Sequence, residues 1–199
     1  MGSLFFRGIL GRCERLMLLL AAVFLALTFA GPLWSLRLDA PQYPEGLALH
    51  VYAWKLGGKI DIINALNHYI GMKAVRESDF IEFRILPWIF GGAALMFLGA
   101  AASRRRWMAG ATLLVLAPIL AFLLYDLYRW LWTYGNELDP RAPIRLAPFT
   151  PPMIGSNRVA NFRTLSYFNW GTLLLAAGLV LAGVALWRSR PSRRGEGGP

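Results

Sequence analysis

The sequence predicts an all-α membrane protein with four transmembrane helices and two extracytoplasmic loops that form a small cap. Of the 199 residues, 56% are hydrophobic and only 16% are charged, and the mean hydropathy is +0.44. Soluble domains carry about 25% charged residues. The apolar residues also gather in long runs, and a run of about 20 residues spans the hydrocarbon core of a bilayer. These observations together predict the membrane class.

Four apolar runs are long enough to cross a membrane. They cover residues 16–36, 86–102, 107–132 and 170–187. The first is interrupted only by Thr28 and Ser35, and the second carries no charge. Pro87 lies near the start of the second run, where helix-initiating prolines are common. We therefore expect segment 1–36 to hold the N-terminus and first helix, 86–132 the second and third helices, and 170–187 the fourth.

The arginines indicate which side of the membrane each segment occupies. They gather in three short flanks: Arg7, Arg12 and Arg15; Arg104, Arg105 and Arg106; and Arg188, Arg190, Arg193 and Arg194. Short segments rich in arginine are typical of the cytoplasmic side. We therefore expect the protein to reside in the inner (cytoplasmic) membrane. Both termini, including the tail 188–199, are expected in the cytoplasm. The net charge of +10 follows from this topology and does not indicate nucleic-acid binding.

Two alternatives concern the N-terminus. Thr28-Phe29-Ala30 before Gly31 resembles a cleavage site for a secretory signal peptide. We favour retention of the first helix, because the apolar run continues through Leu33 and Trp34. Cys13, the only cysteine, precedes the run and fits no disulfide, paired metal site or lipid attachment site.

The first loop, residues 37–85, is predicted to contain one strand and one short helix. After a turn-rich start, the β-branched and aromatic residues of 47–54 favour a strand with His50, Tyr52 and Trp54 on one side. Gly57 and Gly58 break this strand, and a helix is expected over 61–72. The second loop, 133–169, is rich in proline and is expected to be irregular and ordered by contacts.

The predicted helix in the first loop carries the strongest candidate for metal chemistry. On a helix, His68 and Met72 are four residues apart and share one face. An imidazole beside a thioether suits copper better than zinc or magnesium. His50 or Met153 from the second loop are candidates to complete the site. Asp61 or Asn64, one to two turns earlier, are candidates to hold the imidazole tautomer.

The alternative is a short amphipathic helix on the membrane surface, in which His68 only forms hydrogen bonds. Its apolar side chains would then pack towards the membrane: Ile62, Ile63, Leu66 and Ile70.

Asp126 and Arg129 interrupt the third run near its end. They lie within one helical turn, and charge in a membrane is costly unless it is paired or hydrated. We interpret them as an ion pair within a belt of tyrosine and tryptophan. The alternative is a polar notch that gates a ligand or docks a partner.

Motifs of common enzyme classes are missing, so we do not expect an enzyme. The chain has no P-loop, no GxSxG, no HExxH and no CxxCH sequence. Glu137 and Asp139 have the chemistry of an acid and base pair, but the following Pro140 favours a turn instead.

Three loop segments have distinctive sequences: NHYIGMK at 67–73, YGNELDPRAPI at 134–144 and PPMIGSNRVANF at 151–162. They resemble segments of little-characterised bacterial membrane proteins found with the genes for nitrous oxide reductase and its copper-assembly factors. The resemblance implies a role in maturing or supplying that periplasmic copper enzyme. The chain departs from the family at Asn136, where a histidine often stands, and this removes one candidate ligand from the second loop.

The leading hypothesis is an accessory protein that binds or transfers copper, or docks a copper-carrying partner, during assembly of a periplasmic cuproenzyme. Its expected partners are membrane lipid and a periplasmic or membrane protein. The first alternative is a structural or assembly subunit of a respiratory complex without metal. The second is a transporter or quinone-linked electron-transfer component built around Asp126 and Arg129.

Overall fold

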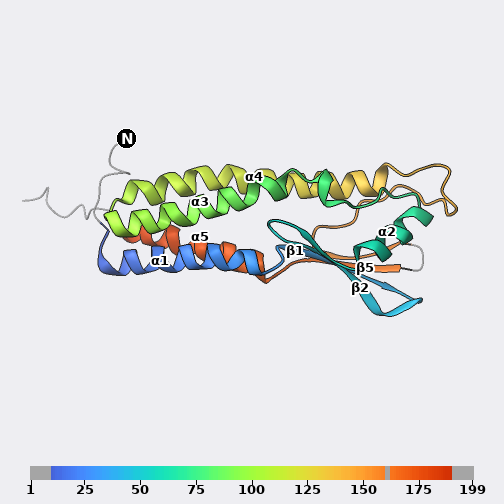
Figure 1. The fold of residues 1–199 in the computed structure, drawn as a ribbon, viewed down its shortest axis with the longest axis horizontal. Coiled ribbons are helices and arrows are strands. Elements are labelled where there is room, and N and C mark those ends of the chain that lie inside the picture. Colours follow the sequence, from blue (N-terminus) through green and yellow to red (C-terminus); the bar gives the residue numbers. More distant parts are fainter. Residues whose placement is uncertain (1–9, 160–161, 190–199) are drawn as a thin grey trace, which may run out of the picture. The chain divides into compact units, whose positions relative to one another are not determined.

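The computed structural model describes residues 10–159 and 162–189, which form five α-helices and one five-stranded sheet (Figure 1). In chain order the elements are α1 (Arg12–Leu27), the 3₁₀ turn η1 (Thr28–Ala30), β1 (Trp34–Ala40), β2 (Tyr43–Val51), β3 (Leu56–Gly58), α2 (Ile60–Tyr69), the 3₁₀ turn η2 (Glu77–Asp79), α3 (Glu82–Ser103), α4 (Arg106–Asn136), β4 (Gly155–Val159), β5 (Phe162–Phe168) and α5 (Trp170–Arg188).

The four expected membrane-spanning helices are confirmed. Within the described residues, α1 with η1, α3, α4 and α5 are long and apolar enough to cross a membrane. Large apolar side chains on them are exposed, including Leu95, Leu114, Leu173 and Val180. In water such surfaces would be costly, whereas lipid is an apolar solvent for them. The protein is therefore a membrane protein.

The expectation of a purely α-helical fold is wrong, because a five-stranded antiparallel sheet is present. The first apolar run does not remain helical to residue 36, since α1 ends at Leu27 and η1 at Ala30. Trp34 already belongs to β1. The second loop is not irregular throughout, because it contributes β4 and β5.

The chain divides into two compact units. Of the described residues, the helix unit comprises 10–27, 89–118 and 174–189, and the sheet unit comprises 28–88, 119–159 and 162–173. Helices α3, α4 and α5 each have residues in both units. Residues far apart in the sequence thus form each unit together.

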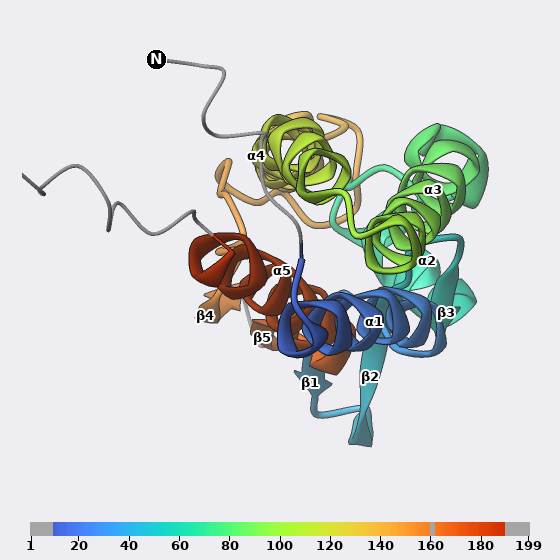
Figure 2. The same cartoon turned by 90° about the vertical axis from the view of Figure 1, so that its left-hand side faces the viewer.

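Helices α1 and α5 lie side by side (Figure 2). They pack through small residues. Ala21, Ala182 and Ala185 are fully buried. A Cβ atom added to Gly178 on α5 would lie 2.9 Å from Leu25 Cδ1 and 3.1 Å from the Ala21 carbonyl oxygen on α1. Small residues allow helices in membranes to approach closely and gain van der Waals contact. The packing of α1 against α5 therefore depends on this glycine.

The sheet has the strand order β3-β2-β1-β5-β4, and every neighbouring pair is antiparallel. The central strand, β1, pairs with β2 on one side and with β5 on the other, so Leu36 lies opposite both Leu49 and Ser166. Side chains alternate between the faces of a strand. Leu36 and Leu38 accordingly face the interior while Arg37 and Asp39 are exposed.

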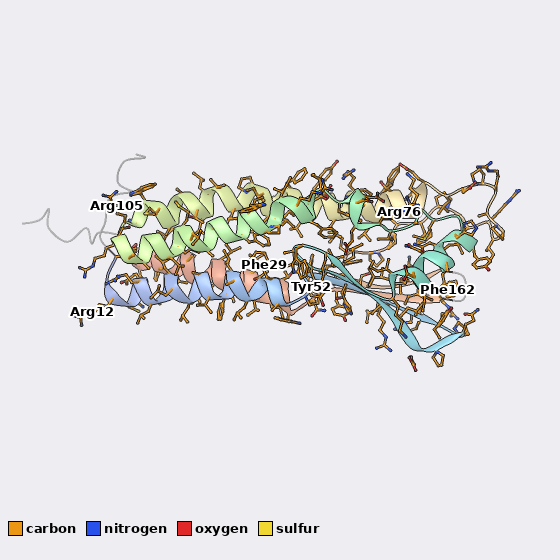
Figure 3. All side chains as sticks on the ribbon, in the orientation of Figure 1. Arg12, Phe29, Tyr52, Arg76, Arg105 and Phe162 are labelled. Carbon is orange, nitrogen blue, oxygen red and sulfur yellow. The ribbon has the colours of Figure 1, made fainter. Side chains whose placement is uncertain are left out.

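The predicted strand over 47–54 begins earlier and ends earlier than expected. β2 covers Tyr43–Val51, so His50 is within it, but Tyr52 and Trp54 lie in the turn that leads to β3. There the Trp54 indole N–H donates to the Phe29 carbonyl oxygen at 3.3 Å. Figure 3 labels Phe29 and Tyr52 in this region.

One hydrophobic cluster of the sheet unit joins β3, the segment after α2, and α4. Leu56, Val75 and Tyr134 are its buried members. Met72, Phe80 and Trp130 are among the partly buried side chains packed against them. Residues of both predicted loops therefore share this cluster.

Candidate functional site

His68 and Met72 are not both on a helix as predicted, because α2 ends between them. α2 stops at Tyr69, three residues before Met72. The Ile70 N–H and the Met72 N–H both donate to the Asn67 carbonyl oxygen, at 3.2 and 2.9 Å. Gly71 then adopts a φ of +78°, the left-handed conformation with which glycine commonly ends a helix. The two side chains are consequently not an i,i+4 pair on one helix face.

The same turn binds the second loop through its backbone. The Asp139 N–H donates to the Gly71 carbonyl oxygen at 2.8 Å, and the Ile144 N–H donates to the Tyr69 carbonyl oxygen at 3.0 Å. The Lys73 ammonium also forms an ion pair with the Glu137 carboxylate. Segments about 70 residues apart are thereby held side by side.

An open surface hollow of about 690 Å³ lies between these two segments, and we call it the loop hollow. Residues 68, 71–73 and 137–143 line it. His68 is exposed, whereas Met72 is partly buried and also packs against the hydrophobic cluster. The residues that line the loop hollow thus include His68, Met72, Glu137 and Asp139.

Asp139 is held as an anion in the loop hollow. The Arg141 N–H donates to its carboxylate at 2.9 Å, and this hydrogen bond, with the charges of Arg141 and His68, holds the pKa of Asp139 below its ordinary value. Hydrogen bonds to the charged form of a carboxyl favour that form. The carboxylate therefore remains ionised to a lower pH than an unperturbed aspartate.

The other predicted ligands lie in different settings. The His50 Nδ1 atom hydrogen bonds to Ser35 Oγ at 2.8 Å, and Ser35 Oγ also accepts from Asn169 Nδ2 at 2.8 Å. Met153 precedes β4, and its carbonyl oxygen accepts from the Trp34 indole at 2.8 Å. Neither residue lines the loop hollow.

Asp61 and Asn64 were predicted to hold the His68 imidazole. Among the described residues, neither forms a hydrogen bond with His68. Asp61 is exposed in the first turn of α2. Asn64 is engaged with Val75, because its Nδ2 donates to the Val75 carbonyl oxygen at 3.0 Å and its Oδ1 accepts from the Val75 N–H at 2.7 Å. Asn64 therefore acts as a clamp on the segment that follows α2.

Asn64→Ala is expected to lower the free energy of unfolding by about 2 kcal/mol, because it leaves the backbone groups of buried Val75 without partners. The measurement is the thermal unfolding of the purified full chain. Asp61→Ala, on the same helix, is the matched control and should cost less than about 1 kcal/mol, since it only removes an acid from the first turn. Equal losses in the two variants would contradict the clamp.

Asp126 and Arg129 form the expected ion pair. Arg129 Nε and Nη2 donate to Asp126 Oδ1 at 2.9 and 2.6 Å. The Asp126 side chain is 7% exposed and that of Arg129 48% exposed. The guanidinium also lies over the Trp130 ring, 4.9 Å from its centroid.

Sequence reasoning missed the contribution of Lys73, Glu137 and Asp139 to the loop hollow. The turn expected at Pro140 is present, but the same segment also faces α2. The opposite charges of Lys73 and Glu137 were the available signal. Within residues 10–159 and 162–189, no three His, Cys, Asp or Glu side chains gather in a way that could hold a metal ion.

Comparisons with family models, with curated proteins and with solved structures find no match to this chain.

Proposed function

We propose that this membrane protein is an accessory factor that binds copper at the loop hollow and passes it on, or presents it to a protein partner. In this proposal the protein resides in the inner membrane with both termini in the cytoplasm, and the two loops, residues 37–85 and 133–169, are extracytoplasmic. The arginine-rich flanks support that orientation. The resemblance of segments 67–73, 134–144 and 151–162 supports a cuproenzyme such as nitrous oxide reductase as the destination.

The observation that carries the proposal is that His68 and Met72 line the same hollow as Glu137 and Asp139. Imidazole and thioether donors suit cuprous copper, and imidazole with carboxylate suits cupric copper. The hollow therefore contains donors for either oxidation state. Its open, exposed rim also suits transfer, because a bound ion would remain accessible to a second protein.

The proposed ligand set is narrower than the set predicted from sequence. His68 and Met72 remain, with Asp139 or Glu137 as an additional donor. Glu137 forms a close ion pair with Lys73, whereas Asp139 forms a looser one with Arg141 at 3.5 Å. Asp139 is therefore the better third ligand. His50, engaged with Ser35, is outside this set and serves as the control histidine.

The test compares cuprous copper retention by the purified full chain against a chromogenic chelator. The double variant His68→Ala/Met72→Leu should lose at least tenfold in copper affinity, because both nitrogen and sulfur donors are gone while leucine preserves the packing volume. His50→Gln should retain copper as the wild type does. Unchanged affinity in the double variant, or an equal loss in the control, would overturn the proposal.

A further inference from the structure

Two exposed arginines face each other across the neighbouring strands β4 and β5. Arg158 on β4 lies directly opposite Arg163 on β5. Directly opposed side chains of an antiparallel pair lie on the same face of the sheet, and like charges in that position are destabilising. Among the described residues, neither guanidinium forms an ion pair or a hydrogen bond. The sheet thus carries a like-charge contact that no described ion pair relieves.

The carboxylate that is nearest in register is already engaged. Asp39 on β1 lies opposite Arg163, but its Oδ1 atom accepts from Arg37 Nε at 2.9 Å. The three arginines and the one aspartate leave a net charge of +2 on this part of the outer face. Asp39 therefore does not neutralise the pair formed by Arg158 and Arg163.

The two opposed arginines line an open surface hollow of about 680 Å³, which we call the arginine hollow. Residues 39–41, 156 and 157 also line it. Among them, Ser156 and Asn157 have side chains that can donate hydrogen bonds. The planar guanidinium group matches the paired oxygen atoms of a carboxylate or a phosphate. The arginine hollow therefore has the charge and the donors that suit an oxyanion.

Leu165 favours a protein segment over a free ion as the source of that oxyanion. It follows Arg163 on the same face of β5, where it lies opposite Ser156 on one side and Arg37 on the other. Its side chain is 41% exposed. A free inorganic ion gains nothing from an exposed apolar neighbour, whereas a peptide with an apolar side chain beside its acids would remove this surface from water.

The position of the arginine hollow favours a soluble partner over a lipid headgroup. β5 runs from Arg163 at the hollow to Phe168, and α5 begins two residues later at Trp170. At about 3.4 Å per residue, Arg163 is about 17 Å along the strand from Phe168. Exposed charges are screened over about 8–10 Å at physiological salt. Headgroups next to the start of α5 would therefore attract these arginines only weakly.

We propose that the arginine hollow docks an acidic segment of a soluble protein partner. Two carboxylates of that segment pair with Arg158 and Arg163, and an apolar side chain between them covers Leu165. Complementary charge of this kind sets the encounter and the register of a complex more than its affinity, so the docking is reversible. The proposal does not rest on copper binding, because no residue lines both the arginine hollow and the loop hollow.

Fluorescence anisotropy of a labelled hexapeptide of alternating glutamate and leucine tests the proposal, with the purified full chain in a neutral detergent. We expect saturable binding of this peptide and none of the matched peptide of alternating lysine and leucine. A peptide of alternating glutamate and serine should bind more weakly, because it cannot cover Leu165. Arg158→Gln/Arg163→Gln should weaken binding of the glutamate–leucine peptide about fivefold to tenfold, the value of two exposed ion pairs.

Two controls separate docking from folding and from net charge. The thermal midpoint of Arg158→Gln/Arg163→Gln should equal or exceed that of the wild type, because the variant removes a like-charge contact. Its copper retention should also be unchanged. Arg76→Gln/Arg145→Gln removes the same charge from exposed positions outside the arginine hollow and should bind the peptide as the wild type does.

Competition distinguishes the possible sources of the anion. Inorganic phosphate and the short-chain lipid dihexanoyl phosphatidylglycerol are each added at the concentration of glutamate–leucine peptide that half-saturates the protein, and we expect neither to displace it. Displacement by phosphate would indicate a site for a free ion, and displacement by the lipid a headgroup site, and either result would overturn the proposal. Absence of peptide binding to the wild type, or equal losses in the two double variants, would overturn it as well.

Discussion

Gly135→Ala is expected to lower the free energy of unfolding by at least about 3 kcal/mol, at the upper end of the cost of overpacking. An added Cβ atom would overlap the Phe149 carbonyl oxygen and lie 3.2 Å from Pro151 Cδ. The obstacle is backbone, and that backbone is bonded to the same helix end: the Phe149 N–H donates to the Gly135 carbonyl oxygen at 3.0 Å. The side chain cannot be accommodated unless the segment before β4 moves away from α4.

The measurement is the thermal midpoint of the purified full chain, which should fall by about 6–12 °C at 2–4 °C per kcal/mol for a chain of this size. Gly92→Ala is the control, because Gly92 is also helical but has nothing within 4 Å of its added Cβ. Alanine favours a helix over glycine by up to about 1 kcal/mol, so the control should be neutral or stabilising. Equal behaviour of the two variants would contradict the close approach at Gly135.

Gly71→Ala is expected to weaken both folding and copper binding, although it changes no proposed ligand. At φ +78° a Cβ atom is strained by about 1–2 kcal/mol. The added atom would also lie 2.9 Å from the Asp139 carbonyl oxygen. Separation of this turn from the second loop would move His68 and Met72 away from Asp139. We therefore expect a loss of about 2–3 kcal/mol in stability and at least a fivefold loss in copper affinity.

Gly155→Ala separates the two causes. Gly155 has a φ of +116°, but nothing lies within 4 Å of its added Cβ, so this variant has the strain without the collision. It should lose stability while copper affinity stays at the wild-type value. If copper affinity falls equally in both variants, the juxtaposition at Gly71 is not what supports the site.

The membrane helices could be predicted from sequence because each is encoded locally by a run of about 20 apolar residues. The error at residues 16–36 has the same origin. Leu33, Trp34 and Leu36 extend the apolar run into β1, although Ser35, Arg37 and Asp39 already alternate with apolar neighbours. Alternation of this kind is typical of a strand. The alternation at the start of β1 was missed because it directly follows the apolar run of α1.

The pairing of strands and the composition of the loop hollow are not local properties. β1 pairs with β5, so Leu36 lies opposite Ser166, and no pattern in either segment specifies its distant partner. Likewise, Asp139 reaches Gly71 through one backbone hydrogen bond, which any two residues could form. His68 and Met72 were found from their chemistry, but Asp139 required the folded chain.

X-ray absorption spectroscopy of the copper-loaded full chain tests the central claim most directly. We expect one sulfur scatterer at the cuprous ion, from Met72, together with nitrogen or oxygen scatterers that include the His68 imidazole. Met72→Leu should remove the sulfur contribution, and His68→Ala the imidazole contribution, while His50→Gln leaves the spectrum unchanged. A wild-type spectrum without sulfur, or a sulfur contribution that persists in Met72→Leu, would contradict copper binding at the loop hollow.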